Sequence, residues 1–254
     1  MEKPLPQSGL VGEKPNYGGT GWHVFINLFL SVILLSTATL GALFFHPLLL
    51  LLALPSLYFL VKAFLWMKGG MLEEKVKIRD ELIKFVHPKE GCRVLDVGTG
   101  GGLLAIGFAK ALENCEVVGI DVWMKLGGGT TIKTAERNAE IEGVAGKVRF
   151  EVGDARKIPY PDGYFDIVCG SFVVHVIRKG RERALREMVR VLKPGGKLAL
   201  IEPKREAWTK WKVNDELKAM LEELELENVK FHPISISYPR RRNVYLIYGE
   251  KAKG

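Results

Sequence analysis

An uncharged segment near the N-terminus limits most strongly how this chain can fold. Residues 24–61 contain no Asp, Glu, Lys or Arg, a run of 38 residues (61 − 24 + 1). As one helix the run would be roughly 57 Å long, whereas a bilayer core of about 30 Å needs only about 20 residues. The length therefore suits two spans. Because proline cannot continue a helix, His46-Pro47 is the expected turn, between helices from about Val24 to Phe45 and from about Leu48 to Trp66.

The charges around this segment predict its orientation. The turn carries none, whereas four basic residues follow the second helix closely. These are Lys68, Lys75, Lys77 and Arg79. Since cytoplasmic loops carry an excess of Lys and Arg, we expect a multi-pass protein of the cell membrane with two helices. Both termini and the globular part would then lie in the cytoplasm.

The predicted organisation has three parts: a flexible N-terminal tail over residues 1–21, a transmembrane helical hairpin over 22–67 and a globular domain over 71–254. A secretory signal peptide is excluded, because its apolar region runs about 7–15 residues and no Ala-x-Ala cleavage site follows here. A pair of helices buried in a protein core is left as an alternative to the membrane hairpin.

Composition restricts the partners further. The formal charge of +8 and the pI near 9.3 suit anionic lipid headgroups and nucleic acid equally well. Cys92, Cys115 and Cys169 are far apart and odd in number. They form neither a disulfide framework nor a zinc spacing, so we expect no metal site and a reducing compartment.

The globular part begins with an apolar run that ends in an acid and then in glycines. Residues 94–102 have the sequence Val-Leu-Asp-Val-Gly-Thr-Gly-Gly-Gly, and a helical pattern from Leu103 to Leu112 follows. This order predicts a parallel strand, a tight turn and a helix N-terminus. Glycine has no Cβ, so the backbone of such a turn can approach a ligand closely. Residue 103 is Leu, so the dinucleotide pattern G-x-G-x-x-G is incomplete.

Strands and helices then alternate, which predicts an α/β fold with a parallel sheet covered on both faces. The expected strands are Arg93–Val97, Glu116–Asp121, Val148–Val152, Phe165–Ser171 and Lys197–Ile201. Two further strands, Val229–Ser235 and Arg242–Gly249, would close the sheet as an antiparallel hairpin.

Three acids stand where successive strands end: Asp96, Asp121 and Asp154. Ligands of an open parallel sheet bind outside the carboxyl ends of its strands. Asp121 follows Asp96 by 25 residues (121 − 96), near the spacing at which an acid accepts ribose hydroxyls. Any one of these acids could instead be a helix cap, but three in register favour a binding site.

Five motifs in order make the chain resemble the class I S-adenosylmethionine-dependent methyltransferases. They are Val-Leu-Asp96-Val-Gly98-Thr-Gly100-Gly, Val-Val-Gly-Ile-Asp121-Val, Glu-Val-Gly-Asp154-Ala155, Pro159-Tyr-Pro-Asp-Gly-Tyr-Phe165-Asp166-Ile-Val and Val191-Leu-Lys-Pro-Gly-Gly196. The likeness covers about residues 75–250. The sequences of these motifs are similar to those of the quinone, sterol and small-molecule branch of the family, and to those of membrane-anchored bacterial and archaeal members. The likeness implies a Rossmann-like seven-stranded sheet and S-adenosylmethionine as cofactor.

The resemblance also implies roles for matched residues. Gly98, Thr99 and Gly100 would cradle the methionine and ribose part of the cofactor, with Asp96 near the methionine amine. Asp121 would hold the ribose hydroxyls.

On the adenine side, Val122 and Trp123 would lie against the ring, Asp154 would accept from the adenine amino group and Ala155 would supply a backbone contact. Ser171 would face the sulfonium and the acceptor. Between these motifs, the glycine-rich loop at residues 124–131 is longer than in the family pattern, and it would be either a mobile lid or an inert insertion.

His175 is the histidine that follows the fourth strand at the ligand edge. It is the candidate catalytic residue, as a base or a group that orients the acceptor, and a purely structural histidine is the alternative. A base is needed only if the acceptor must lose a proton before it takes the methyl group.

The leading hypothesis is a membrane-anchored methyltransferase that acts on a lipid, isoprenoid or other hydrophobic small molecule. The Asn/Asp-Pro-Pro-Tyr/Phe tetrapeptide of enzymes that methylate bases and glutamine is absent after the fourth strand, so no nucleic-acid partner is expected. Two alternatives are left: methylation of a soluble metabolite or protein with the hairpin as mere localisation, and a cofactor-binding assembly subunit without turnover.

Overall fold

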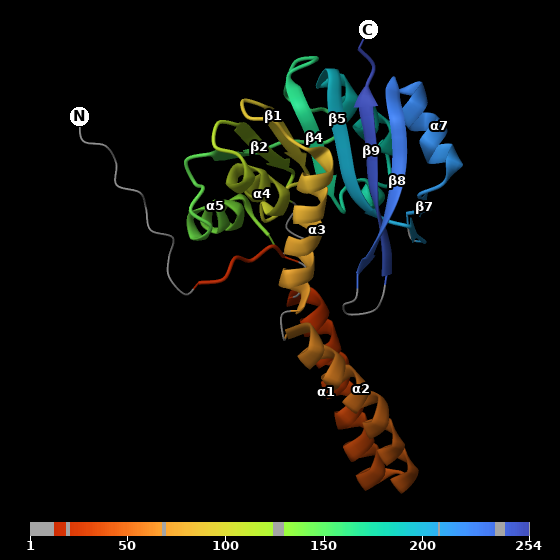
Figure 1. Ribbon diagram of the computed structural model, residues 1–254. Coiled ribbons are helices and arrows are strands. Elements are labelled where there is room, and N and C mark those ends of the chain that lie inside the picture. Colours follow the sequence, from red (N-terminus) through yellow and green to blue (C-terminus); the bar gives the residue numbers. More distant parts are fainter. Residues whose placement is uncertain are drawn as a thin grey trace, which may run out of the picture.

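A long helical hairpin extends from one end of an α/β domain (Figure 1). The structure, a computed structural model, describes residues 13–18, 21–67, 70–123, 130–207, 209–236 and 242–253. The hairpin consists of α1 (Gly21–Phe44), a 3-10 helix η1 (Pro47–Leu52) and α2 (Ala53–Met67). The chain reverses at Phe45 and His46, as predicted from the proline that follows.

Small residues let the two hairpin helices approach closely. Ala38 and Ala63 are fully buried, and a Cβ added to Gly41 would lie 2.6 Å from Cδ1 of Leu49. Between the helices, Ser56 Oγ donates to the carbonyl of Ser31 at 2.9 Å. Small residues and interhelical hydrogen bonds are typical of helix contacts within membranes.

The outer faces of the hairpin are apolar and open. The spans Val24–Phe44 and Pro47–Phe64 have mean hydropathies of 2.0 and 1.9, yet only 22% and 11% of their residues are buried. At the turn, Phe44 and Phe45 are 75% and 84% exposed. The described chain therefore does not enclose these helices, which argues against the alternative of a buried core pair.

A third helix, α3 (Gly70–Val86), joins the hairpin to the sheet and ends just before Pro88, as predicted. Its apolar stripe is buried in the core. The residues are Ile78, Leu82, Ile83 and Val86. Through this packing the hairpin is attached directly to the domain.

The sheet has seven strands in the order β3-β2-β1-β4-β5-β9-β8, of which β1 to β5 are parallel and β8 and β9 are antiparallel. The strands are β1 (Arg93–Val97), β2 (Glu116–Asp121), β3 (Val148–Val152), β4 (Phe165–Ser171), β5 (Leu192–Pro203), β8 (Leu226–Ile236) and β9 (Arg242–Lys251). The predicted seven-stranded Rossmann-like fold is therefore confirmed. A short pair, β6 (Arg205–Glu206) and β7 (Trp211–Lys212), follows β5 and was not predicted.

Helices cover both faces of the sheet and create two cores. The helices are α4 (Leu103–Ala111), α5 (Ile132–Ile141), α6 (Arg181–Arg190) and α7 (Asp215–Glu223). One core contains buried residues of α3, α4 and α5, and the other contains those of α6 and α7. This is the two-sided covering that a parallel sheet requires.

The carboxyl ends of the parallel strands lie on the hairpin side of the domain. Pro203, at the carboxyl end of β5, pairs with Val244 near the start of β9. The arrowhead of β9 and the chain terminus lie on the side away from α1 and α2 (Figure 1). Since β5 runs opposite to β9 and parallel to β4 and β1, the ligand-binding edge of the sheet faces toward the hairpin.

Two of the three cysteines are neighbours in the folded sheet. The register of β1 and β2 pairs Arg93 with Glu116, so Cys92 and Cys115 are neighbours, and their Sγ atoms lie 3.1 Å apart. Burial and the hydrogen bond to Cys115 raise the pKa of the Cys92 thiol to about 12. Sheet pairing thus brings together two thiols that are 23 residues apart in the chain, and both are free.

Candidate functional site

The glycine turn between β1 and α4 is fixed by backbone contacts to the neighbouring strand. The amides of Gly98 and Thr99 both donate to the carbonyl of Ile120, at 2.8 and 3.0 Å. Gly98 has a φ of +70°, and a Cβ there would lie 2.4 Å from Cγ2 of Val173. At Gly100, with φ +53°, a Cβ would meet only Thr130 Oγ1, at 3.5 Å. The turn is therefore closed at Gly98 and open at Gly100.

Asp96 lies beneath this turn and is 1% exposed. Its Oδ2 accepts from the Thr99 hydroxyl at 2.7 Å and from the Ala105 amide at 3.1 Å. Its Oδ1 is buried and has no hydrogen-bond partner among the described residues. Burial, opposed by these two hydrogen bonds, raises the pKa of Asp96 to about 7. An acceptor atom without a donor is therefore held at the turn.

Asp121, at the end of β2, connects the turn to the next loop. Its Oδ2 accepts from the Gly100 amide at 2.9 Å, and its Oδ1 accepts from the Trp123 amide at 2.8 Å. The Trp123 indole donates back to the Gly100 carbonyl at 3.0 Å. A carboxylate has about four acceptor sites, so two more donors can still bind Asp121. Val122, between these residues, is 46% exposed.

The third predicted acid has a different environment. Asp154 accepts four hydrogen bonds from Arg156, one from the backbone amide and three from the guanidinium. The Arg156 guanidinium holds the pKa of Asp154 below its usual range. Ala155 is 9% exposed. A contact between Asp154 and adenine stays a prediction, and Arg156 would compete for the same oxygens.

The acceptor side is formed by the loop after β4. Ser171 ends β4 and pairs with Ile201, and Phe172 follows with a φ of +56°. His175 lies in the 3-10 helix η2 (Val174–Val176) with its side chain 14% exposed. Its Nδ1 lies 2.6 Å from Oε2 of Glu202, a fully buried residue of β5. The structure thus places the predicted candidate base beside a carboxylate.

An N-terminal strap, residues 13–18, packs over the glycine turn. The Asn16 amide donates to Asn138 Oδ1, and Asn138 Nδ2 donates to the carbonyls of Asn16 and Gly101, each at 2.8 Å. Tyr17 donates to Glu142 at 3.0 Å. Residues 13–18 of the expected tail thus contact α5, and the flexibility of the tail stays a prediction.

The strap is also tied to α3. Lys75 Nζ donates to the carbonyls of Tyr17 and Gly18, at 3.1 and 2.5 Å. Burial lowers the pKa of Lys75 to about 8. The strap directly precedes α1, and α3 directly follows α2. Both ends of the hairpin are therefore connected to segments that contact each other beside the glycine turn.

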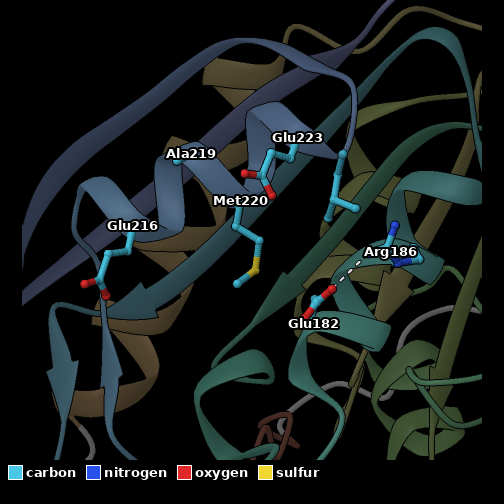
Figure 2. Close-up of a pocket in the computed structure, with 7 residues that line it drawn as sticks. Glu182, Arg186, Glu216, Ala219, Met220 and Glu223 are labelled. Atoms are coloured by element: carbon cyan, nitrogen blue, oxygen red, sulfur yellow. Dashed lines mark hydrogen bonds and ion pairs between the residues drawn. The ribbon is translucent and has the colours of Figure 1, made fainter.

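A separate hollow lies between α6 and α7 (Figure 2). Its lining residues are mostly charged or polar: Glu182, Arg186, Glu216, Ala219, Met220, Glu223 and Leu224. Arg186 pairs there with Glu182 at 2.9 Å. No residue of the glycine turn lines it, so this hollow is not the candidate cofactor site.

The residues around the glycine turn fit a cationic, ribose-bearing cofactor. At the turn, Asp96 Oδ1 has no hydrogen-bond partner among the described residues. The Asp121 carboxylate accepts two hydrogen bonds and has acceptor sites for about two more. Among the described residues, no Lys or Arg side chain hydrogen-bonds residues 96–102, whereas a P-loop carries a Lys that reaches the phosphates of its nucleotide. Most of the predicted glycine loop, residues 124–129, lies outside the described residues, and its role as a lid stays a prediction.

Comparison with known families matches residues 95–200 to a methyltransferase domain. The ubiquinone/menaquinone biosynthesis C-methyltransferase UbiE of Azotobacter vinelandii is 38% identical over 115 residues, which cover 45% of this chain and 43% of the relative. The uncharacterized methyltransferase YcgJ of Bacillus subtilis is 33% identical over 134 residues, 51% of this chain and 49% of the relative. These matches support a class I S-adenosylmethionine-dependent methyltransferase.

Solved structures agree with this methyltransferase fold. The crystal structure of YcgJ matches with a TM-score of 0.57 at 21% identity, and covers 69% of this chain and 98% of that one. A SAM-dependent methyltransferase from Aquifex aeolicus matches with a TM-score of 0.54 at 25% identity, and covers 68% of this chain and 88% of that one. The match to each curated relative named above spans under half of that relative's length.

Sequence reasoning missed two site residues of the methyltransferase domain. Asn138 carried no signal, since an asparagine within a helical pattern is unremarkable. Glu202 follows an apolar strand as Asp96 and Asp121 do, and that pattern could have found it.

Removing the Asn138 side chain is expected to release the strap. Asn138→Ala loses three hydrogen bonds and leaves the buried Gly101 carbonyl without this donor, at a cost of about 1–3 kcal/mol in the free energy of unfolding. Limited proteolysis should then cut within residues 13–18 faster than in the wild type. Glu140→Ala, on the same helix and 48% exposed, is the control. Equal cutting rates in both variants would contradict the strap.

Proposed function

We propose that this chain is a membrane-anchored S-adenosylmethionine-dependent methyltransferase that transfers a methyl group to a lipid, isoprenoid or other hydrophobic small molecule. One observation carries the proposal: the glycine turn lies at the edge of the sheet that faces an exposed apolar hairpin (Figure 1). The relative from Azotobacter, named for ubiquinone and menaquinone biosynthesis, supports a hydrophobic acceptor.

The residues of this chain would divide the work as follows. Gly98, Thr99 and Gly100 form the backbone cradle, Asp96 offers Oδ1 to the cationic amine, and Asp121 binds the ribose hydroxyls. S-adenosylmethionine supplies a methyl group already activated by the positive charge on sulfur. Positioning can then provide most of the rate, since well-oriented reactants gain roughly 7–11 kcal/mol.

The acceptor would be placed by the loop after β4. Ser171 and His175 come from the carboxyl end of this strand, beside the Gly98 turn through Val173. Val122 and Trp123 would lie against the adenine, with Ala155 nearby. The acceptor and the cofactor are thus brought together at one edge of the sheet.

The hairpin would hold this edge at the bilayer. With two spans and four basic residues close after the second one, both termini and the catalytic domain would lie in the cytoplasm. A lipid-soluble acceptor could then enter from the membrane without crossing water.

Charges placed in the middle of the hairpin are expected to remove the protein from the membrane. Ile33 and Leu57 are 45% and 57% exposed, so arginine at both positions would face the lipid. Each arginine costs about 2.5–3.5 kcal/mol at the centre of a span. Flotation of the double variant with vesicles should show it unbound, whereas Phe45→Arg at the turn should float. Flotation of the double variant would argue that the hairpin is not inserted.

Transfer of labelled methyl groups tests the function itself. Full-length protein with methyl-labelled S-adenosylmethionine is expected to label a component of membrane extracts and not of soluble extracts. Label in the soluble extract would favour a soluble metabolite or a protein as acceptor. Cofactor binding without label in either extract would favour a non-catalytic assembly subunit.

A further inference from the structure

Glu202 lies at the carboxyl end of β5, and its carboxylate contacts three backbone amides and the imidazole of the loop after β4. It is 0% exposed. Its Oε1 accepts from the amides of Val173 and Val174, at 3.0 and 2.6 Å. Its Oε2 lies 3.3 Å from the His175 amide and 2.6 Å from His175 Nδ1. One buried carboxylate therefore holds both the backbone and the ring of this loop.

These contacts determine which ring nitrogen carries the proton. A carboxylate can only accept hydrogen bonds, and the three backbone partners are all N–H donors. The fourth partner, Nδ1, must then also donate, which leaves the lone pair of the neutral imidazole on Nε2. Among the hydrogen bonds between described residues, none involves Nε2.

The surroundings hold the ring in place. Arg181 donates to the carbonyls of Val174 and His175, at 3.2 and 3.4 Å. The ring of Phe172 meets the imidazole edge-on, with ring centroids 6.0 Å apart. Among the described residues, the charged side chains that hydrogen-bond residues 173–175 are thus Glu202 from β5 and Arg181 from α6.

We propose that Glu202 is a positioning residue that keeps His175 as a neutral base with its lone pair on Nε2, and that the acceptor is a hydroxyl or an acidic ring carbon. This inference rests on the proposed function. A neutral amine already has a free electron pair and needs no base before transfer, whereas a phenol or an enolisable ring carbon has to lose a proton.

The proposed step balances as follows. The acceptor's O–H or C–H proton passes to Nε2 of His175, which becomes an imidazolium beside the Glu202 carboxylate. The electron pair left on the acceptor forms the new bond to the methyl carbon. The pair of the broken carbon–sulfur bond stays on sulfur, and the imidazolium later releases its proton to solvent.

Glu202→Gln tests the role of the carboxylate. The Gln carbonyl can still accept from backbone amides, but its NH₂ donates toward Nδ1 and so moves the ring proton to Nε2. We expect kcat to fall by about 10²–10⁴-fold, with little change in cofactor affinity. His175→Ala should lose as much, and the double variant no more than either, because the two residues act as a unit. Glu202→Asp should recover part of the rate, and His232→Ala, an exposed histidine of β8, should match the wild type.

NMR of the wild-type protein tests the tautomer of His175 without a measurement of turnover and without a variant that has to fold. Nitrogen NMR of histidine-labelled wild type should show His175 protonated at Nδ1, and the Glu202→Gln spectrum should show the Nε2–H form. Wild type in the Nε2–H form, or an unchanged kcat in Glu202→Gln, would overturn the proposal. If the protein labels no acceptor at all, the proposed function fails, while the NMR result still decides the role of Glu202.

The product decides the acceptor class. Labelled methyl groups on oxygen or carbon, located by hydrolysis and mass analysis of the membrane product, are the expected result. Methyl groups on nitrogen would overturn the assignment of the acceptor, even if the cofactor site is correct.

Discussion

Asp121→Ala is expected to weaken S-adenosylmethionine binding by about 100-fold or more. A hydrogen bond to a charged group contributes about 1.5–3 kcal/mol, and the Asp121 carboxylate would accept from the two ribose hydroxyls. The substitution also removes the acceptor of the Gly100 and Trp123 amides, so the turn would keep only its backbone hydrogen bonds to β2. Isothermal titration calorimetry of full-length protein measures the change.

Two further variants separate these effects. Asp121→Asn keeps one oxygen for a backbone amide, so its loss of affinity should fall between those of the wild type and Asp121→Ala. Asp162→Ala removes a carboxylate whose side chain is 80% exposed and which pairs with Arg190, and it should bind like the wild type. Equal affinities for Asp121→Ala and Asp162→Ala would refute this part of the site.

Asp96→Asn is expected to stabilise the cofactor-free protein at pH 8 and to weaken its binding of the cofactor. Burial raises the pKa of Asp96 to about 7, so its carboxyl ionises more readily in the unfolded chain. The stability of the wild type therefore falls as pH rises from about 4 to about 7, a loss of about 2–4 kcal/mol at pH 8. Asparagine avoids that loss and can still accept from Thr99 and Ala105.

Urea unfolding across this pH range measures the difference. The variant should be the more stable one at pH 8, and the advantage should disappear as the pH falls to about 4 and below, where the carboxyl becomes protonated in the unfolded state as well. Calorimetry should show weaker cofactor binding, because the amide carries no negative charge for the methionine amine. A stability difference that does not change with pH would contradict a buried, ionisable Asp96.

Local patterns were sufficient to predict most of the fold. The bounds of β1, β2, β3 and β4 agree with the predicted strands, because apolar runs between glycine-rich turns define buried parallel strands. The strand β5 is longer than the predicted Lys197–Ile201, because it also includes residues 192–196 and extends to Pro203. The hairpin turn also follows from local signals, namely the charge-free run and its proline.

Contacts between distant segments could not be predicted. Asn16 and Asn138 are 122 residues apart, and their pairing depends on how the strap crosses α5. The Glu202–His175 contact needs the pairing of β4 with β5, which brings residues 27 apart to one edge. For Asp154, the sequence indicated the position of the acid but not that Arg156 would occupy its oxygens.

Titration of S-adenosylmethionine into folded full-length protein in lipid nanodiscs tests the central claim most directly. The account predicts saturable binding to a single site, competition by the demethylated product S-adenosylhomocysteine, and a large loss of affinity in Asp121→Ala. A folded, membrane-inserted sample that binds neither compound would contradict it.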